Sequence, residues 1–217
     1  MNKIKKEFDI NDANIMYKLS YFECQKMVSN KEGFCLTLSS MMKEHRYQHS
    51  FSVAKTAYKI ALKTGLYDPK TAFIAGLLHD CGKDIERDKE SEIMTSYFAE
   101  YKDFPHYAWH EFTGRYLAET VFNIKDENIL DAIMFHCTGH NDMKPLEMIV
   151  YAADKVEPKR DFKTKYARSL CYKDILKGFK YVIKDQKRFL LEKNINYMNN
   201  KFTIGMYQQY LGEQDEH

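Results

Sequence analysis

The sequence predicts an all-α protein, a helical bundle with a metal centre buried in its core. Only four prolines and nine glycines occur in 217 residues, and they separate segments whose apolar side chains recur at helical spacing. No segment shows the sustained alternation of apolar and polar residues that is typical of a half-buried strand. Histidines and aspartates recur in or at the ends of apolar segments, and helical bundles build metal sites from several helices in this way.

The chain divides into a short extension and one domain. Residues 1–20 are polar and aperiodic, so we expect residues 1–30 to form a loosely ordered N-terminal extension. We assign residues 31–217 to one domain, because no linker or internal repeat divides them and their number suits a single core.

The first helices of the domain have recognisable ends. We expect helices over about 34–44 and 47–64, the second ending before Gly65, since glycine adopts the left-handed conformation that closes many helices. Asp68 followed by Pro69 marks the start of the next helix, as its N-cap and first helical residue.

That next helix is apolar, with the sequence AFIAGLLHD, and is expected to end at His79 and Asp80. A charged loop over about 82–90 follows. In the longest later segment, apolar residues recur at helical spacing while the lysines fall mostly on the other face. Helical segments are expected over about 91–102, 107–122, 127–137, 145–156, 163–194 and 201–211.

The composition argues against a membrane-spanning protein and favours the cytoplasm. Apolar residues make up 44% of the chain and charged residues 29%, and no apolar run approaches the ~20 residues that span a bilayer. The basic N-terminal residues are not followed by the apolar core of a signal peptide. Five cysteines, an odd number without CxxC spacing, indicate reduced thiols in a cytoplasmic protein.

The charge is unevenly distributed along the chain. The net charge is +2, but residues 155–188 hold twelve basic and four acidic residues, so the remainder of the chain carries −6. This basic segment is either a solvated helix face or a source of positive potential that attracts a polyanionic ligand.

The order of histidines and aspartates is the main functional signal. Asp80 and Asp154 each follow an apolar run, where an ionised carboxylate is costly to bury unless a cation neutralises it. For Asp154, an ion pair with Lys155 is the alternative. Imidazole nitrogens and carboxylate oxygens without a thiolate suit iron, manganese, cobalt or zinc. The candidate ligands are His49, His79, Asp80, His110, His136 and Asp154.

The ligand types indicate how two ions would be held. Asp80 is best placed to bridge them, because each of its oxygens can bind one ion. Lys83 follows closely and can neutralise phosphate charge; an exposed loop lysine beside Asp84 is the alternative. We assign His49, His79 and Asp154 to one ion, and His110 and His136 to the other. Three further histidines are expected to be structural: His45, His106 and His217.

Several stretches of the chain together resemble one known family. The pattern is similar to the HD-domain phosphohydrolase superfamily and, more narrowly, to the YqeK-type family of bacterial symmetrical diadenosine-tetraphosphate hydrolases. The similarity covers about residues 33–212. The stretches that carry it are HRYQHSFSVAKTA (45–57), AGLLHDCGKDI (75–85), HEFTGRYLAE (110–119), ILDAIMFHCTGHNDM (129–143) and LEMIVYAADKVEPKRDF (146–162). Cys137 and the pair Cys81-Gly82 depart from the usual family pattern.

The resemblance implies a substrate, a cofactor and a set of roles. A metal-activated hydroxide would attack a central phosphorus of diadenosine tetraphosphate and give two ADP. The cofactor would be one or two ions, iron foremost, with manganese or cobalt as substitutes. The partner would be a dinucleoside polyphosphate rather than a nucleic-acid polymer or a membrane, and a homodimer is left open. The six candidate ligands are the family's ligand positions, Asp80 and Lys83 take catalytic roles, and the substrate contacts are Arg46, Lys83, Thr138, Gly139 and Arg160, with His140 at the rim.

Three alternatives stay open at this point. One is another HD-domain phosphohydrolase that acts on a mononucleotide or a guanosine alarmone, since it would share every metal ligand. The second is a nucleotide sensor without catalysis, which would have no need for an open site with two metals. The third is a mixed-valent di-iron oxygenase on the same ligands, which the basic residues around the site disfavour.

Overall fold

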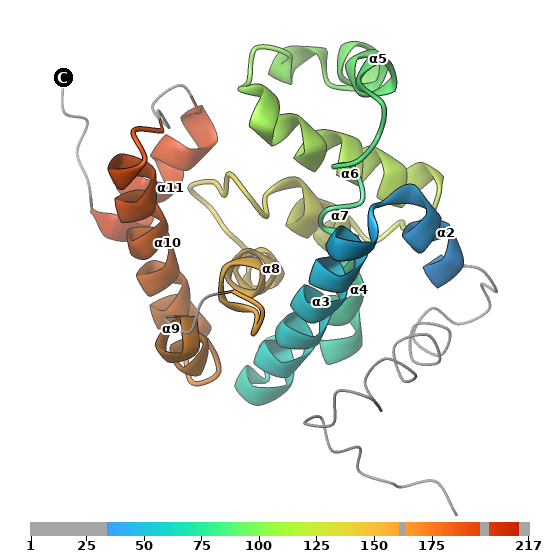
Figure 1. Cartoon of the computed structure of the whole chain (residues 1–217). Helices are drawn as coiled ribbons and strands as arrows, with labels where there is room; N and C mark the ends of the chain where they lie inside the picture. The colour runs from blue at the N-terminus through green and yellow to red at the C-terminus, as the bar shows by residue number, and fades with distance from the viewer. Residues whose placement is uncertain (1–33, 161–163, 196–199, 213–217) are drawn as a thin grey trace, which may run out of the picture.

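The structure is a computed structural model that describes residues 34–160, 164–195 and 200–212, and within these ranges it is helical without strands. Figure 1 shows the helices gathered into a bundle around α8. Their order is α2 (Phe34–Met41), α3 (Glu44–Thr64), α4 (Pro69–Leu78), α5 (Arg87–Tyr97), η1 (Ala99–Tyr101), η2 (His106–Ala108), α6 (Trp109–Thr120), α7 (Glu127–Met134), α8 (Pro145–Val156), α9 (Thr164–Cys171), α10 (Ile175–Glu192) and α11 (Lys201–Leu211). The predicted fold class is therefore confirmed.

The turn between α3 and α4 forms as the sequence predicts. Gly65 closes α3 in the left-handed conformation, with φ of 67°. Asp68 caps α4 by accepting a hydrogen bond from the backbone N–H of Thr71 at 2.8 Å, and Pro69 is the first helical residue. This tight connection lets α4 return along α3, and α3 also packs on α8.

Several predicted boundaries differ from the structure, as two of them illustrate. The charged loop is shorter than expected, because α5 already begins at Arg87. The segment 163–194 is divided between α9 and α10, since the side chain of Asp174 accepts a hydrogen bond from the Lys177 N–H and starts a new helix. A Cβ atom on Gly178 would lie 2.6 Å from the backbone of Cys171, so α10 crosses α9 at a position where only glycine fits.

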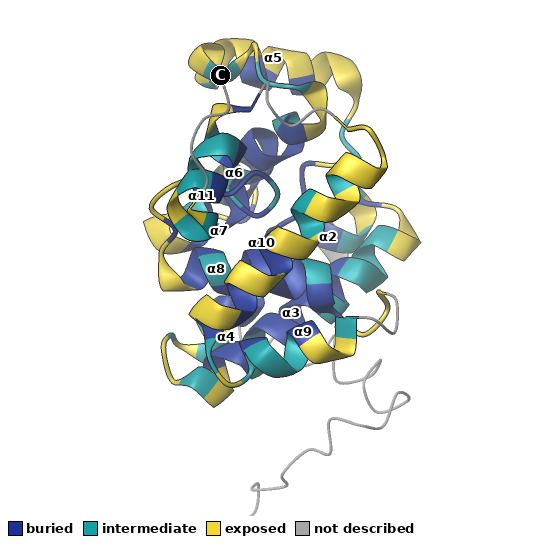
Figure 2. Ribbon diagram, turned by 90° about the vertical axis from the view of Figure 1, so that its left-hand side faces the viewer, coloured by how far each residue is buried: buried dark blue, intermediate teal, exposed yellow. Residues whose placement is uncertain are grey.

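The core lies where α3, α4, α7 and α8 meet, and α10 covers it from one side. Figure 2 shows α10 with one exposed face and one buried face, as its apolar periodicity predicts. A smaller aromatic cluster around Phe112 fills the space under α5 and η1. None of the helices described is long and apolar enough to span a bilayer. The expected N-terminal extension, residues 1–30, lies outside the described residues.

Candidate metal centre

His79 stands at the end of α4, where the apolar helix meets the centre of the bundle. Its ring is fully buried, and Nδ1–H donates to the carbonyl oxygen of Gly76 at 2.8 Å. Burial lowers the pKa of His79 to about 3, so the ring is neutral at neutral pH. Its Nε2 therefore carries a lone pair, and this buried atom has no hydrogen-bond partner. An orphaned acceptor in the core is unfavourable unless a cation binds it.

His110 and His136 repeat this arrangement on the other side of the site. The Nδ1–H of His110 donates to the carbonyl of Tyr107 and that of His136 to the carbonyl of Ile133, both at 2.7 Å. These bonds place the ring proton on Nδ1 and turn Nε2 towards the site, as in histidines that bind metals. The two Nε2 atoms lie 3.2 Å apart. Burial also holds the pKa of His110 well below its ordinary value.

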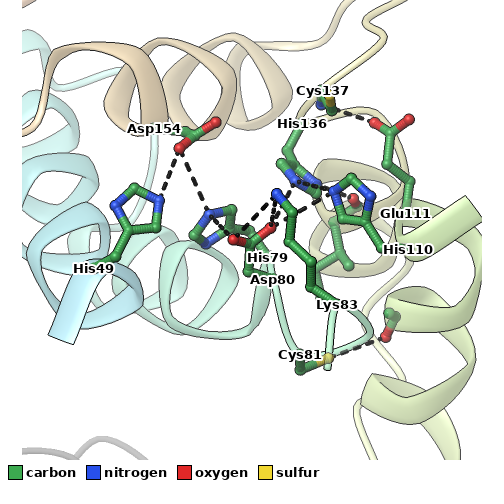
Figure 3. A network of polar contacts seen from close by, with 12 residues as sticks. His49, His79, Asp80, Cys81, Lys83, His110, Glu111, His136, Cys137 and Asp154 are labelled. Carbon is green, nitrogen blue, oxygen red and sulfur yellow. Dashed lines mark hydrogen bonds and ion pairs between the residues drawn. The ribbon is translucent and has the colours of Figure 1, made fainter. Parts of the chain in front are cut away.

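Asp80 lies between the histidines, as Figure 3 shows. Its Oδ1 is 3.4 Å from Nε2 of His136 and 3.6 Å from Nε2 of His110, and its Oδ2 is 3.7 Å from Nε2 of His79. Although burial alone would raise the pKa of Asp80, its contacts with the surrounding histidine rings and with the cationic Lys83 hold it well below its ordinary value. The carboxylate is therefore ionised and shared between the two sides of the site.

A close contact between the turn after α4 and helix α6 brings these ligands together. A Cβ atom on Gly82 would lie 2.6 Å from the Gly114 N atom and 2.7 Å from the His110 carbonyl oxygen. The neighbouring Cys81 is buried and its thiol donates to the Gly114 carbonyl at 3.4 Å. The departure at Cys81-Gly82 thus lets the turn after Asp80 lie directly on the helix that carries His110.

His49 is oriented by two carboxylates. Its Nε2–H donates to Oδ1 of Asp154 at 2.9 Å and its Nδ1–H donates to Oε1 of Glu157 at 3.2 Å. Although burial alone would lower the pKa of His49, the hydrogen bonds to Asp154 and Glu157 raise it to about 9. His49 is therefore a cation at neutral pH in this arrangement, and a metal ion would have to displace its proton.

Asp154 takes part in the ion pair that the sequence offered as the alternative. Its Oδ2 lies 2.7 Å from Nζ of Lys155, and its Oδ1 lies 2.9 Å from Nη2 of Arg160. Oδ1 is also 3.8 Å from Nε2 of His79, so the carboxylate borders the site as well. The half-buried Lys155 makes a second bond, to the carbonyl oxygen of His136 at 2.8 Å. Asp154 thus forms the ion pair with Lys155 and also lies beside the candidate metal ligands.

The geometry supports two metal positions that share one residue. Two groups of three residues have potential ligand atoms within 4.8 Å of one another, and both contain Asp80. The two groups are His49, His79 and Asp80, and Asp80, His110 and His136. Imidazole nitrogens and an ionised carboxylate suit a divalent or trivalent ion. Asp154 borders the first group without being part of it in this arrangement.

The predicted phosphate-contacting cations surround the centre on its exposed side. The Arg46 Nη1 is 3.4 Å from Asp80 Oδ2, and Lys83 Nζ is 3.2 Å from Asp80 Oδ1. The side chains are 19% exposed in Arg46, 40% in Lys83 and 49% in Arg160, so solvent reaches all three. Asp84 orients Arg46 by accepting from its Nε at 2.7 Å.

The segment after His136 places the remaining predicted contacts. Thr138 is buried, and both its N–H and its hydroxyl are bound by Glu111. The N–H of Gly139 donates to the carbonyl of Phe135 at 3.1 Å. His140 differs from the prediction in its surroundings, because its Nε2 lies 2.7 Å from Oε2 of Glu147 and its Nδ1 accepts from a backbone N–H at 3.2 Å. Both ring nitrogens of His140 are therefore engaged within the protein.

Sequence reasoning missed three acidic residues: Glu111, Glu157 and Asp84. Each orients a site residue or the segment that carries it. The sequence did carry a signal for Glu157, since it stands three residues after Asp154 and precedes a proline. Among the histidines expected to be structural, His106 pairs with Glu90 at 2.8 Å on α5, away from the centre, His45 is exposed, and His217 lies outside the described residues.

Known proteins share this arrangement of sequence and fold. Residues 46–159 match the HD domain. The chain is 33% identical over 168 residues to the symmetrical bis(5'-nucleosyl)-tetraphosphatase of Bacillus subtilis, across 76% of this chain and 90% of that protein. It is 31% identical over 175 residues to the protein of the same name from Halalkalibacterium halodurans, across 79% of this chain and 91% of that protein.

A solved structure agrees with these matches. The crystal structure of a predicted HD superfamily hydrolase involved in NAD metabolism, from Clostridium acetobutylicum, superposes with a TM-score of 0.71 at 32% identity. The superposition covers 83% of this chain and 96% of that one. The residues that match the HD domain include all six predicted metal ligands.

Proposed function

The chain belongs to the HD-domain family and, more narrowly, to the symmetrical bis(5'-nucleosyl)-tetraphosphatases, and from this premise we propose that it hydrolyses diadenosine tetraphosphate to two ADP. The observation that carries the proposal is Asp80, whose carboxylate is shared by two groups of ligand atoms. Such an arrangement suits two ions that act together on a phosphate.

The proposed ligands are the six residues predicted from the sequence: His49, His79, Asp80, His110, His136 and Asp154. When bound, the ions supply positive charge to a phosphoryl oxygen and lower the pKa of a water molecule. We further propose iron as the natural metal, with manganese or cobalt as substitutes, because the donor set combines imidazole nitrogens with hard carboxylate oxygens.

The chain's own cations would hold the tetraphosphate. Arg46 and Lys83 contact Asp80, and Arg160 contacts Asp154, so all three neutralise carboxylates that are proposed metal ligands. Once metal charge neutralises those carboxylates, the three side chains can turn towards phosphate oxygens. Because they are exposed to solvent, a large anionic substrate can reach them. A positive charge placed where negative charge develops stabilises the transition state.

The reaction itself asks little of a general acid. Water attacks one central phosphorus, the bond from that phosphorus to the central bridging oxygen breaks, and the bridging oxygen leaves with the first ADP. The second ADP carries the oxygen from water. His79 and His110 are neutral and buried, with their protons held by backbone carbonyls, so neither is placed to donate a proton.

A product assay tests this function. Purified protein would be stripped of metal, reloaded with Fe²⁺, Mn²⁺ or Co²⁺, and incubated with diadenosine tetraphosphate. Chromatography should show ADP as the single product, and the variant Asp80→Asn should show none. ATP with AMP would indicate asymmetric cleavage. Free phosphate, or turnover of mononucleotides or a guanosine alarmone alone, would support another phosphohydrolase activity. Tight binding without turnover would support a nucleotide sensor.

We also propose that the protein works in the cytoplasm, because Cys81, Cys137 and Cys171 are free thiols. A homodimer stays a proposal that sedimentation of the purified protein tests.

A further inference from the structure

Glu111 is a buried acid that the proposed reaction does not use. It follows His110 on α6 and is fully buried. Its Oε1 accepts three hydrogen bonds, from the Cys137 N–H at 2.7 Å, the Thr138 N–H at 3.0 Å and the Thr138 hydroxyl at 3.3 Å. Its Oε2 has no hydrogen-bond partner. Burying a carboxylate is costly, so this arrangement indicates a function for the bonds it makes.

The segment that Glu111 binds has no helix to hold it in place. α7 ends at Met134, and residues 135–138 form turns. Several of their backbone groups are bound by other segments of the chain instead. Lys155 donates to the His136 carbonyl, and the hydroxyl of Thr203 donates to the Thr138 carbonyl at 3.0 Å. Glu111 binds the two N–H groups that lie between these carbonyls. Without Glu111, both N–H groups would be left unpaired.

Glu111 thereby links the two histidines on one side of the metal centre. Two consecutive residues of α6, His110 and Glu111, contact three consecutive residues that follow α7. His110 reaches the Nε2 of His136, while Glu111 holds the backbone directly after it, as Figure 3 shows for Cys137. One carboxylate oxygen thus joins α6 to the segment that carries His136.

We propose that Glu111 is a positioning residue for the half of the metal centre formed by Asp80, His110 and His136. It holds His136 at the spacing from His110 that one ion requires, and it sets the place of Thr138. The part concerning the metal rests on the proposed function, whereas the part concerning the backbone does not. Residues that orient ligands typically change metal affinity about 10–100-fold when they are removed.

Amide hydrogen exchange of the metal-free protein tests the backbone part without any metal or substrate. In Glu111→Ala, the amides of Cys137 and Thr138 should exchange roughly tenfold faster or more, because each loses its acceptor. Glu111→Gln keeps an acceptor oxygen and should retain most of the protection. Val182→Ala, a core truncation on α10, is the matched control for a general loss of stability. Unchanged exchange at both amides in Glu111→Ala would overturn the proposal.

Metal titration in two backgrounds tests the other part, with Mn²⁺ alone as the probe. In His49→Ala, the group of Asp80, His110 and His136 remains, and adding Glu111→Ala should weaken Mn²⁺ binding about 10–100-fold. In His110→Ala, the other group remains, and Glu111→Ala should change its affinity less than about threefold. An equal loss in both backgrounds, or none in the first, would contradict the positioning role. Faster amide exchange with no Mn²⁺ binding by the wild type would instead refute the proposed metal centre alone.

Discussion

The Nε2 atoms of His110 and His136 lie 3.2 Å apart, while both rings donate their Nδ1 protons to backbone carbonyls three residues earlier in the chain. In this orientation the two rings direct their Nε2 atoms at each other, and Asp80 adds an anionic oxygen within 3.6 Å of both. This approach is repulsive without a cation, so the fold arranges the site for positive charge before any ion arrives.

Removing the shared carboxylate should therefore abolish the metal centre. Asp80→Ala is expected to lose bound metal and turnover completely, because both groups of ligands contain Asp80. The melting temperature in metal-containing buffer should fall towards that of the metal-free protein, since ligands stabilise the folds that bind them. Metal analysis together with calorimetry checks this. A full metal content with normal turnover would contradict the bridging role.

Removing a proposed phosphate contact should leave the metals in place. Lys83→Ala and Arg160→Ala are each expected to lower kcat/KM for diadenosine tetraphosphate about a hundredfold, because each removes a charge that stabilises the transition state. The exposed Lys177 on α10 is a matched control, and Lys177→Ala should leave kcat/KM unchanged. Metal content should equal that of the wild type in all three variants. Wild-type kcat/KM in both Lys83→Ala and Arg160→Ala would refute the phosphate contacts.

The crossing of α9 and α10 gives a prediction on stability. Gly178→Ala places a Cβ atom 2.6 Å from the Cys171 backbone, and such overpacking should cost about 1–3 kcal/mol of the free energy of unfolding. Gly205→Ala on α11 is the matched control, because its Cβ atom would be no closer than 3.4 Å to any neighbour. That control should be neutral or slightly stabilising, since alanine favours a helix more than glycine. Urea unfolding of both variants checks the difference.

The sequence predicts those parts of the fold that local chemistry determines. Helix α8 was predicted at its observed bounds, because Pro145 starts it and the Pro158 that follows cannot continue it. Asp80 and Asp154 were predicted as ligands because an ionised aspartate after an apolar run needs a counter-charge. The division of 163–194 was missed, since apolar spacing is nearly continuous across the cap at Asp174.

Partners that act across the fold could not be predicted in the same way. Glu111 binds backbone N–H groups 26 and 27 residues away, and Glu157 binds His49 across 108 residues. Every residue except proline has a backbone N–H group. The sequence therefore does not show which carboxylate accepts a hydrogen bond from such a group. His140 likewise pairs with Glu147, seven residues further along the chain, a partner that the sequence did not indicate.

Metal binding should release a proton from His49. In the metal-free protein the pKa of His49 is raised to about 9, above its ordinary 6.5, so charged His49 stabilises this state fully below pH 6.5. That stabilisation is lost as the pH rises through about 9. A metal ligand must be neutral, so Mn²⁺ competes with this proton at pH 7 and no longer does so well above pH 9. Mn²⁺ affinity should accordingly rise between these values.

The proton can be counted directly. Mn²⁺ would be added to the metal-free protein at pH 7 in weak buffer with a pH indicator, and the released protons compared between the wild type and His49→Gln. The wild type should release about one proton more per protein, because glutamine has none to lose. The comparison removes protons that come from bound water, since both proteins lose those alike. Equal proton release by the two proteins would show that His49 is already neutral before the metal binds, and the carboxylate pair of Asp154 and Glu157 would then not hold it charged.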